Sequence, residues 1–309
     1  MNKRDARIHI IVSEDGVRFL LRDLLRELGY TDIVLSGKFE AIRIAVTENK
    51  PDLLILGTSF PDGDALEMIA DVRQGRLGKN PFLPMMAITL EPTSHLVKKV
   101  VNSGADDLLL YPLSLGHLEQ RLDLLIDNRK KFLVTVDYAG PDRRSADSVR
   151  EHSTSHLLFD APNALRARVK NDMTDKEMQA AIARTVKAMD GHRADSYMRR
   201  ICWFVDRIDA GYAWAGDGIL EPEVSEFLEN LLSTTKQALT VIDEKEQSVY
   251  HYLCSTVLTV TARLVKQGSE IEVKDRKVLV ELSRAIKVAL ETDSGSEISR
   301  HIRDAVSKT

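Results

Sequence analysis

Acidic side chains, which can bind Mg²⁺ and act as nucleophiles, are unevenly placed around two apolar segments near the start of the chain. Glu14 and Asp15 follow the first segment, Ile8–Val12. The second segment, Leu53–Leu56, is followed directly by Gly57. An aspartyl phosphate needs a carboxylate as the nucleophile, and glycine supplies neither a nucleophile nor a metal ligand. A phosphotransfer site at the end of the second segment would therefore lack its central residue.

Other acids near Gly57 do not replace a carboxylate at that position. Asp52 begins the same apolar segment and is expected at the opposite end of the strand. Asp62 and Asp64 belong to the loop that follows. Neither the strand nor its loop therefore offers an obvious substitute nucleophile.

Residues 7–127 alternate short apolar runs with amphipathic stretches, which is typical of a parallel sheet with helices on both faces. The predicted strands are Ile8–Val12, Ile33–Ser36, Leu53–Leu56, Met85–Thr89 and Asp107–Leu110. The predicted helices are Arg18–Leu28, Phe39–Glu48, Leu66–Arg73, Ser94–Ser103 and Leu115–Asp127. Five strand–helix units in about 120 residues predict an α/β flavodoxin-like domain with a five-stranded parallel sheet.

The segment from Pro51 to Glu67 resembles the central strand and following loop of a two-component response regulator receiver (CheY-like) domain. The resemblance implies a metal-dependent phosphotransfer site. Two acids after the first strand and an aspartate after the third would hold magnesium, which shields the charge of the phosphoryl group. A Thr or Ser after the fourth strand and a Lys after the fifth would complete the site.

This chain departs from the family pattern at the acidic positions. Gly57 stands in place of the phosphorylatable aspartate. Two alignments of the first strand are possible: alignment on the helix puts Val12 and Ser13 at the acid positions, whereas alignment on the acids uses Glu14 and Asp15. We favour the first alignment, in which both metal-binding acids are missing.

The fourth and fifth strands complete the comparison. Thr89 keeps the hydroxyl that would sense phosphate, but Tyr111-Pro112 stands where the family has Lys-Pro, and Leu108 replaces the aromatic residue that moves on activation. A tyrosine is not a cation at neutral pH. The family geometry implies a cis peptide bond before Pro112. Together with Gly57, these residues predict a degenerate receiver, or pseudo-receiver, without aspartyl phosphorylation.

Residues 129–170 form a basic connector of irregular pattern. Gly140–Arg144 reads Gly-Pro-Asp-Arg-Arg and resembles a stretch that follows receiver domains in some bacterial regulators, a resemblance that implies no mechanism. Nucleic-acid binding usually needs a concentrated basic surface, and only this connector offers one. We interpret it as a solvated linker, within which Lys131–Val136 is a candidate strand.

From Thr174 onward the pattern is helical. Thr174–Glu177 has the spacing of a capping box. Glu223–Gln267 contains no Gly or Pro and exceeds an ordinary helix of about 11–12 residues, so it is one long helix or two with a break near Asp243–Glu246. With a further helix at Asp275–Glu291, residues 171–309 predict an all-α bundle of at least four helices.

Two patterns in the helical region could support phosphoryl chemistry. Asp243 and Gln247, four residues apart on the predicted long helix, resemble the acid and amide of helical phosphatases that act on receiver domains. His192 resembles a phosphotransfer histidine, but Arg193, Ala194 and Asp195 replace the Lys and Gly that should follow. We interpret His192 as a solvated surface residue.

Composition places the chain among soluble globular proteins. Its 309 residues, 43% of them hydrophobic, suffice for about two domains. No apolar run approaches the roughly 18 residues of a membrane span, and the run near the N-terminus is too short for a secretory signal. Cys202 and Cys254 show no metal-ligand or redox spacing. We expect a cytoplasmic protein with no cofactor and no metal.

The sequence thus predicts a pseudo-receiver at 1–128, a connector at 129–170 and a helical output or dimerisation domain at 171–309. We expect signalling through a protein partner or a homodimer, with Leu115–Asp127 and the preceding strand as the contact surface, and no enzymatic activity. The alternatives are a phosphatase that uses Asp243 and Gln247, or a DNA-binding transcription regulator. The acidic helical region and the lack of a convincing helix-turn-helix weigh against nucleic acid as a partner.

Overall fold

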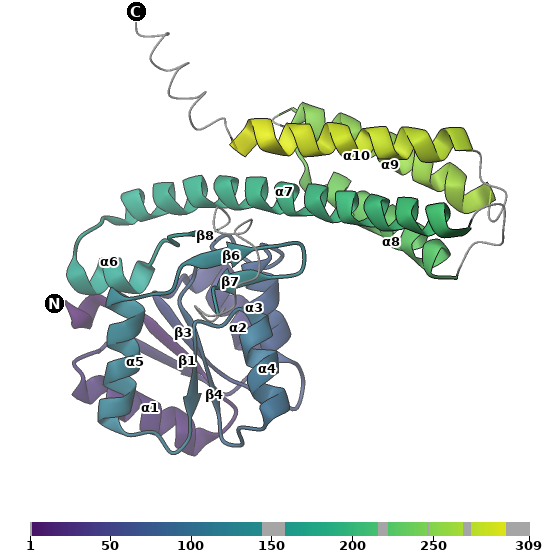
Figure 1. Ribbon diagram of the computed structural model, residues 1–309. Coiled ribbons are helices and arrows are strands. Elements are labelled where there is room, and N and C mark those ends of the chain that lie inside the picture. Colours follow the sequence, from purple (N-terminus) through teal and green to yellow (C-terminus); the bar gives the residue numbers. More distant parts are fainter. Residues whose placement is uncertain (1, 144–157, 216–221, 246, 268–272, 295–309) are drawn as a thin grey trace, which may run out of the picture. The chain divides into compact units, whose positions relative to one another are not determined.

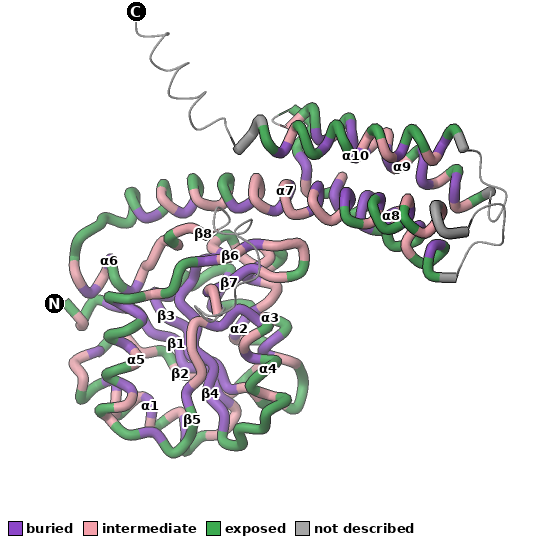
Figure 2. Tube along the Cα trace, viewed as in Figure 1, coloured by how far each residue is buried: buried purple, intermediate pink, exposed green. Residues whose placement is uncertain are grey.

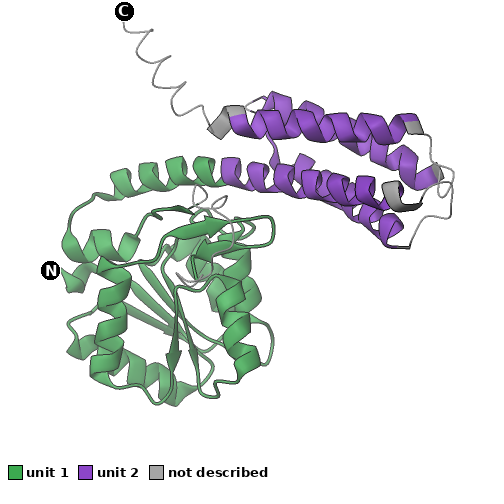
Figure 3. Ribbon diagram, in the orientation of Figure 1, with its two compact units in different colours: residues 1–189 green, residues 190–309 purple. Residues whose placement is uncertain are grey.

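The computed structural model describes residues 2–143, 158–215, 222–245, 247–267 and 273–294. They form two compact units, residues 1–189 and 190–309, which Figure 3 shows in different colours. The first unit contains the expected receiver segment, the described part of the connector and the beginning of the long helix α7 (Asp175–Ala215). Each unit is described separately.

The first unit is built on a five-stranded parallel sheet, as the sequence predicts (Figure 1). The strands are β1 (Ile8–Ile11), β2 (Ile33–Ser36), β3 (Leu53–Gly57), β4 (Met85–Thr89) and β5 (Asp107–Leu110). Their order is β2-β1-β3-β4-β5, the doubly wound order of flavodoxin-like folds. Strands β1, β3 and β4 are buried along their whole length, as continuous apolar runs covered on both faces should be (Figure 2).

Five helical segments cover the two faces of this sheet. They are α1 (Asp15–Glu27), α2 (Glu40–Ile44), α3 (Ala65–Arg73), α4 (Ser94–Ser103) and α5 (Leu115–Asp127). The helix predicted at Phe39–Glu48 is shorter than expected, because a π-helical turn, Ala45–Asn49, follows α2. One apolar core includes residues of α1 and α5, and the other includes residues of α2, α3 and α4. Alternate side chains of the buried strands point into these two cores.

The described connector residues are folded onto the first unit, which corrects our interpretation of a solvated linker. They form an antiparallel sheet of β7 (Ala139–Pro141), β6 (Phe132–Val134) and β8 (Leu158–Phe159), followed by α6 (Ala164–Lys170). The candidate strand is therefore confirmed. A third core joins Phe82 and Phe132 to Met178 and Ile182 of α7. The connector is held by apolar burial as well as by the polar contacts described below.

The second unit is helical, as expected. It contains the later part of α7, α8 (Pro222–Val241), α9 (Ser248–Gln267) and α10 (Val273–Ser294). Tyr197, Ile201 and Ile208, which are spaced along one face of α7, are buried. At the start of α7 the capping box is present, because Thr174 Oγ1 accepts from the Glu177 N–H at 3.3 Å and Glu177 Oε2 accepts from the Thr174 N–H at 2.8 Å.

The long apolar pattern is two helices with a break, one of the two alternatives that the sequence left open. Helix α8 ends at Val241 and α9 begins at Ser248. Asp243 Oδ1 accepts from the Lys245 N–H at 2.9 Å, a side-chain turn that competes with continued helix. Within the described residues, no helix is long and apolar enough to cross a membrane.

Candidate functional site

The carboxyl ends of the strands are where a site is expected in an open α/β sheet. In this chain β1, β3, β4 and β5 end near Ser13, Gly57, Thr89 and Tyr111. The parallel register brings these ends to one edge of the sheet. The residues predicted for the degenerate site therefore do share one edge, the carboxyl edge.

At that edge, Gly57 is packed against the residue that follows β1. Ile11 pairs with Leu56, so Val12 and Gly57 come next on the two neighbouring strands. A β-carbon on Gly57 would lie 3.3 Å from both Cα and Cγ1 of Val12, and its three nearest atoms all belong to Val12. Val12 is fully buried. An apolar side chain thus contacts the position where a nucleophilic carboxylate would begin.

The polar groups after β1 are engaged with their own surroundings. Ser13 Oγ donates to the Ser59 carbonyl at 2.7 Å. The Arg18 guanidinium donates to the carbonyls of Val12 and Ser13 and pairs with Asp15. The carbonyl oxygens at the end of β1 are therefore already bound by a cation of the protein itself, the Arg18 guanidinium.

The two acids considered in the alternative alignment lie beyond the end of the strand. Asp15 is the first residue of α1, and Glu14 occupies the N-cap position without a side-chain cap hydrogen bond. Acidic side chains at a helix N-terminus interact favourably with the helix dipole. Both acids thus have a role in the helix start, and neither is among the atoms nearest to Gly57.

The two remaining strand ends carry Thr89 and Tyr111. Thr89 is buried, and its Oγ1 accepts from the Glu91 N–H at 3.3 Å, so the hydroxyl stabilises the turn after β4. Tyr111 is exposed, and the Tyr111–Pro112 peptide bond is cis, as the resemblance implied. Leu108 packs against the core that contains residues of α3 and α4. None of these side chains adds a cation beside Gly57.

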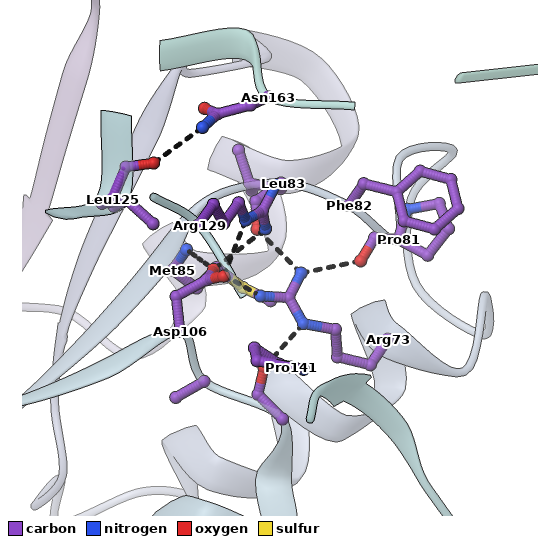
Figure 4. A network of polar contacts seen from close by, with 12 residues as sticks. Arg73, Pro81, Phe82, Leu83, Met85, Asp106, Leu125, Arg129, Pro141 and Asn163 are labelled. Atoms are coloured by element: carbon purple, nitrogen blue, oxygen red, sulfur yellow. Dashed lines mark hydrogen bonds and ion pairs between the residues drawn. The ribbon is translucent and has the colours of Figure 1, made fainter. Parts of the chain in front are cut away.

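The amino edge, where the strands begin, contains a polar cluster that the sequence did not reveal (Figure 4). Asp106 precedes β5, and its carboxylate contacts Arg73 Nη2 at 2.8 Å and Arg129 Nε at 2.8 Å. Its Oδ2 also accepts from the Met85 N–H at 2.8 Å. The side chains of Arg73, Asp106 and Arg129 are only 1%, 2% and 6% exposed. We call these three residues the Asp106 cluster.

The charges and the burial of this cluster shift the pKa values of Asp106 and Arg73. Burial alone would raise the pKa of Asp106, but Arg129 and Arg73, helped by hydrogen bonds, hold that pKa below its usual value. Burial lowers the pKa of Arg73 to about 10, and Arg129 adds to this effect while Asp106 opposes it. The cluster is therefore ionised at neutral pH, with two cations around one anion.

The connector supplies much of the cluster's environment. Arg129 Nη1 donates to the Pro162 carbonyl at 2.9 Å, and Asn163 Nδ2 donates to the Leu125 carbonyl at 2.7 Å. The Phe132 ring of β6 lies 5.2 Å from the Arg73 guanidinium and 4.8 Å from that of Arg129. An aromatic face this close to two cations adds a cation–π attraction. The connector and the five-stranded sheet, called the receiver sheet below, thus share one buried polar cluster.

The Gly-Pro-Asp-Arg motif also attaches the connector to the five-stranded sheet, through contacts with the residues just before β5. Arg143 Nη2 donates to the carbonyls of Ala105 at 2.6 Å and Asp106 at 3.0 Å. A β-carbon on Gly140 would lie 2.8 Å from the Gly104 Cα and 2.7 Å from the Tyr138 hydroxyl. Only glycine permits this approach of β7 to the turn before β5. The motif therefore has a structural role at the amino edge; Arg144 lies outside the described residues.

The Asp243–Gln247 pair of the phosphatase alternative lies between two helices. Asp243 follows α8 and Gln247 precedes α9, and the Gln247 N–H donates to the Asp243 carbonyl at 2.9 Å. This backbone bond keeps the two residues one helical turn apart, and the phosphatase alternative stays a prediction. Among the residues that the structure describes, no group of three or more His, Cys, Asp or Glu could hold a metal ion.

Comparisons with known proteins identify the N-terminal part of the first unit. Residues 8–123 match the response regulator receiver domain family. KdpE, the KDP operon transcriptional regulatory protein of Escherichia coli, is 32% identical over 43% of this chain and 61% of its own length. PhoP, the alkaline phosphatase synthesis transcriptional regulatory protein of Bacillus subtilis, is 29% identical over 41% of this chain and 49% of its own. The matched segment thus spans 61% of one relative and 49% of the other.

Solved structures give matches of similar extent. CheY4, a chemotaxis protein of Vibrio cholerae, is 21% identical over 38% of this chain and 96% of that one, with a TM-score of 0.34. A two-component response regulator of Clostridium difficile is 26% identical over 38% of this chain, with the same TM-score. The family match falls on the strands and helices of the five-stranded sheet. The N-terminal part of this chain, residues 8–123, is a response regulator receiver domain.

Proposed function

We propose that this protein is an atypical, cytoplasmic response-regulator-like signalling protein that acts by protein–protein contact and is not phosphorylated on aspartate. The observation that carries the proposal is the packing of buried Val12 against Gly57. A receiver needs a carboxylate at this position, and here the space that its side chain would enter is limited by an apolar neighbour. The site is altered in shape as well as in chemistry.

The surrounding groups support the same proposal. Ser13 donates to the Ser59 carbonyl, and Arg18 holds Asp15 and two backbone carbonyls. An Mg²⁺ ion prefers several carboxylate and water oxygens in near-octahedral geometry. Tyr111, in the position of the family's lysine, is exposed and carries a phenol in place of an ammonium group. The charges that stabilise a transferring phosphoryl group are therefore missing.

The proposal is tested by incubating the full chain with a small-molecule phosphodonor and Mg²⁺. We expect no stable acyl phosphate by intact-mass analysis, while a receiver that retains the aspartate and the lysine, treated in the same way, gains one phosphoryl group. Gly57→Asp alone should also stay unmodified, because Val12 still fills the neighbouring position. Phosphate on any aspartate of residues 8–123 in the unmodified chain would contradict the proposal.

The contact surface that we propose is formed by β5, α5 and the end of β4. Exposed apolar side chains lie on each of these elements: Leu90, Leu110 and Tyr111 at the carboxyl ends of β4 and β5, and Leu124 on α5 beside Asp106 and Asp107. A group of large apolar side chains on the surface often marks a protein interface. This agrees with the sequence-based expectation for Leu115–Asp127 and the preceding strand.

Self-association through this surface is the form of contact we propose first. The full chain should give a concentration-dependent dimer by light scattering, and Leu124→Gln should weaken it. Phe19→Gln is the matched control, because Phe19 is similarly exposed but lies on α1, which is not part of the proposed contact surface. A monomer at high concentration would remove the homodimer from the proposal, and equal weakening by both variants would place the interface elsewhere.

Transcription regulation remains the second candidate because KdpE of Escherichia coli and PhoP of Bacillus subtilis are named transcriptional regulatory proteins. Their match to this chain covers 61% and 49% of their lengths, and the receiver family match lies at residues 8–123. Binding of duplex DNA should fall steeply with salt if the chain acts in this way. No mobility shift at low salt would eliminate this candidate.

A further inference from the structure

The Asp106 cluster carries more positive than negative charge. Arg73 and Arg129 share the single carboxylate of Asp106, which leaves one formal positive charge in a buried site. Arg143 adds a second cation against the backbone carbonyl of Asp106. Charges removed from water are strongly disfavoured unless they are paired. An additional anion beside the cluster would therefore lower the free-energy cost of its buried excess positive charge.

A cavity lies beside the excess charge. Its volume is about 200 Å³, and its charged lining consists of Arg121, Arg129, Lys130, Arg143, Asp106 and Asp107. Both acids are already engaged, Asp106 in the cluster and Asp107 with Arg121 at 3.2 Å. Four cations and two acids give the lining a formal charge of +2, since 4 − 2 = 2. The cavity is accordingly an electropositive space within the first unit.

Two of the cations have donors to spare. Arg129 is fully committed, because Nε and Nη2 contact Asp106 and Nη1 donates to Pro162. Arg143, by contrast, uses Nη2 for two carbonyls, and its Nη1 donates to no described residue. In the part of the chain that the structure describes, neither Arg143 nor Lys130 lies within ion-pair distance of an acid. The Arg143 Nη1 group and the Lys130 ammonium are therefore left to donate to an acceptor in this cavity, and hydrogen bonds that involve charged groups are stronger than those between neutral groups.

We propose that this cavity binds a tetrahedral oxyanion, either inorganic phosphate or the phosphate group of a small phosphomonoester, with Lys130 and Arg143 as its donors. Guanidinium and ammonium groups together suit phosphate oxygens, which accept several charge-assisted hydrogen bonds. The volume equals roughly six waters of liquid, so a phosphate group fits and the rest of a larger ligand must project out. The Asp106 cluster supplies the positive field.

The position of the donors gives binding a structural consequence. Lys130 lies between α5 and β6, at the start of the connector, whereas Arg143 belongs to the Gly-Pro-Asp-Arg motif after β7. An oxyanion that contacts both links these two parts of the connector directly. Binding therefore stabilises the connector sheet beside the Asp106 cluster, at the edge opposite Gly57.

The proposal is tested on the full chain by calorimetric titration with inorganic phosphate at constant ionic strength, with chloride as the reference anion. We expect saturable binding at one site and a rise in Tm that chloride does not give. Lys130→Gln should weaken binding at least about tenfold, the typical worth of a charge-assisted hydrogen bond. Lys98→Gln on α4, an equal change of charge at another exposed lysine, should bind like the unmodified chain.

The remaining arms separate the sources of the anion and protect the test from misfolding. Arg143→Gln should lose binding as well, but Lys130→Gln is decisive because the Lys130 side chain makes no contact in the Asp106 cluster. Tighter binding of glycerol phosphate than of phosphate identifies a phosphomonoester, and the reverse order identifies free phosphate. Equal effects of phosphate and chloride, or unchanged phosphate binding by Lys130→Gln, would overturn the proposal.

Discussion

The two edges of the receiver sheet differ in how their polar groups are used. At the carboxyl edge, the hydroxyl of Thr89 and the guanidinium of Arg18 make short-range contacts, and Val12 and Gly57 are apolar. At the amino edge, buried carboxylates join segments far apart in the sequence, such as Asp106 with Arg129 and Asp52 with Arg168. The polar contacts of the carboxyl edge, where a site was expected, are local. The amino edge, in contrast, is constrained by charges that link distant segments.

This difference indicates where substitutions should matter. A buried ion cluster tolerates loss of a partner poorly, because the remaining charge stays desolvated. Local turns and exposed side chains usually tolerate substitution. In this receiver, therefore, the amino edge should dominate the stability of the fold, and the following predictions test that inference.

Asp106→Asn should have the largest effect on stability. It leaves Arg73 and Arg129 buried without a carboxylate, and the loss of one partner from a buried pair typically costs about 3 to 5 kcal/mol. Urea unfolding of the full chain, followed by circular dichroism, measures the change. Asp62→Asn in the exposed loop after β3 is the control and should shift the unfolding free energy by less than about 0.5 kcal/mol.

Two comparisons sharpen the interpretation of that variant. Arg129→Met should cost less than Asp106→Asn, because Arg73 and Asp106 then remain as a neutral pair.

The lowered pKa of Asp106 means that its stabilisation is complete above the unfolded-state pKa of about 3.9 and is lost as pH falls through the folded-state pKa. The stability difference between the unmodified chain and Asp106→Asn should therefore shrink on acidification below about pH 4. A constant difference would contradict an ionised Asp106.

Gly140→Ala should have the next largest effect. The added methyl group would lie 2.8 Å from the Gly104 Cα, so either β7 or the turn before β5 must move. Overpacking of this kind costs about 1 to 3 kcal/mol. Gly116→Ala is the matched control, because a methyl group there meets nothing within 4 Å and replaces a helical glycine of α5. It should be neutral or stabilising by about 0.5 to 1 kcal/mol. Equal effects of both substitutions would argue against tight packing at the motif.

The sequence predicted the carboxyl edge much better than the amino edge. Hydrophobic periodicity located all five strands, and the motif around Gly57 located their carboxyl ends, because both signals are local in sequence. The Asp106 cluster depends on Arg73 and Arg129, which lie 33 and 23 residues from Asp106. An acid at a strand start is normally solvated, so nothing local marks this one as buried. Acids at two strand starts, Asp52 and Asp106, beside an arginine-rich connector were the available signal.

The carboxyl edge can be tested by the coupling between Gly57 and Val12. Gly57→Ala should destabilise the chain by roughly 1 kcal/mol, because the new β-carbon would lie 3.3 Å from two Val12 atoms. In a Val12→Ala background, the same change should cost less, because the contact with Cγ1 is removed while the contact with the Cα of residue 12 remains. Alanine also lowers the entropy of the unfolded chain. A double-mutant cycle from urea unfolding measures this coupling, and additivity within about 0.3 kcal/mol would contradict the packing argument.

Tyr111→Lys should have the smallest effect on stability. The side chain is exposed at the end of β5, so the change in unfolding free energy should stay within about 0.5 kcal/mol. It also restores the lysine expected from the receiver family. Combined with Gly57→Asp, it should still give no stable acyl phosphate in the phosphodonor assay, because Val12 and Ser13 supply no metal-binding carboxylate after β1. Val12→Asp added to that pair provides the comparison. Phosphorylation that appears only in this triple variant would show that Val12 prevents phosphorylation. Phosphorylation of the double variant would show that the apolar contact between Val12 and residue 57 is no obstacle.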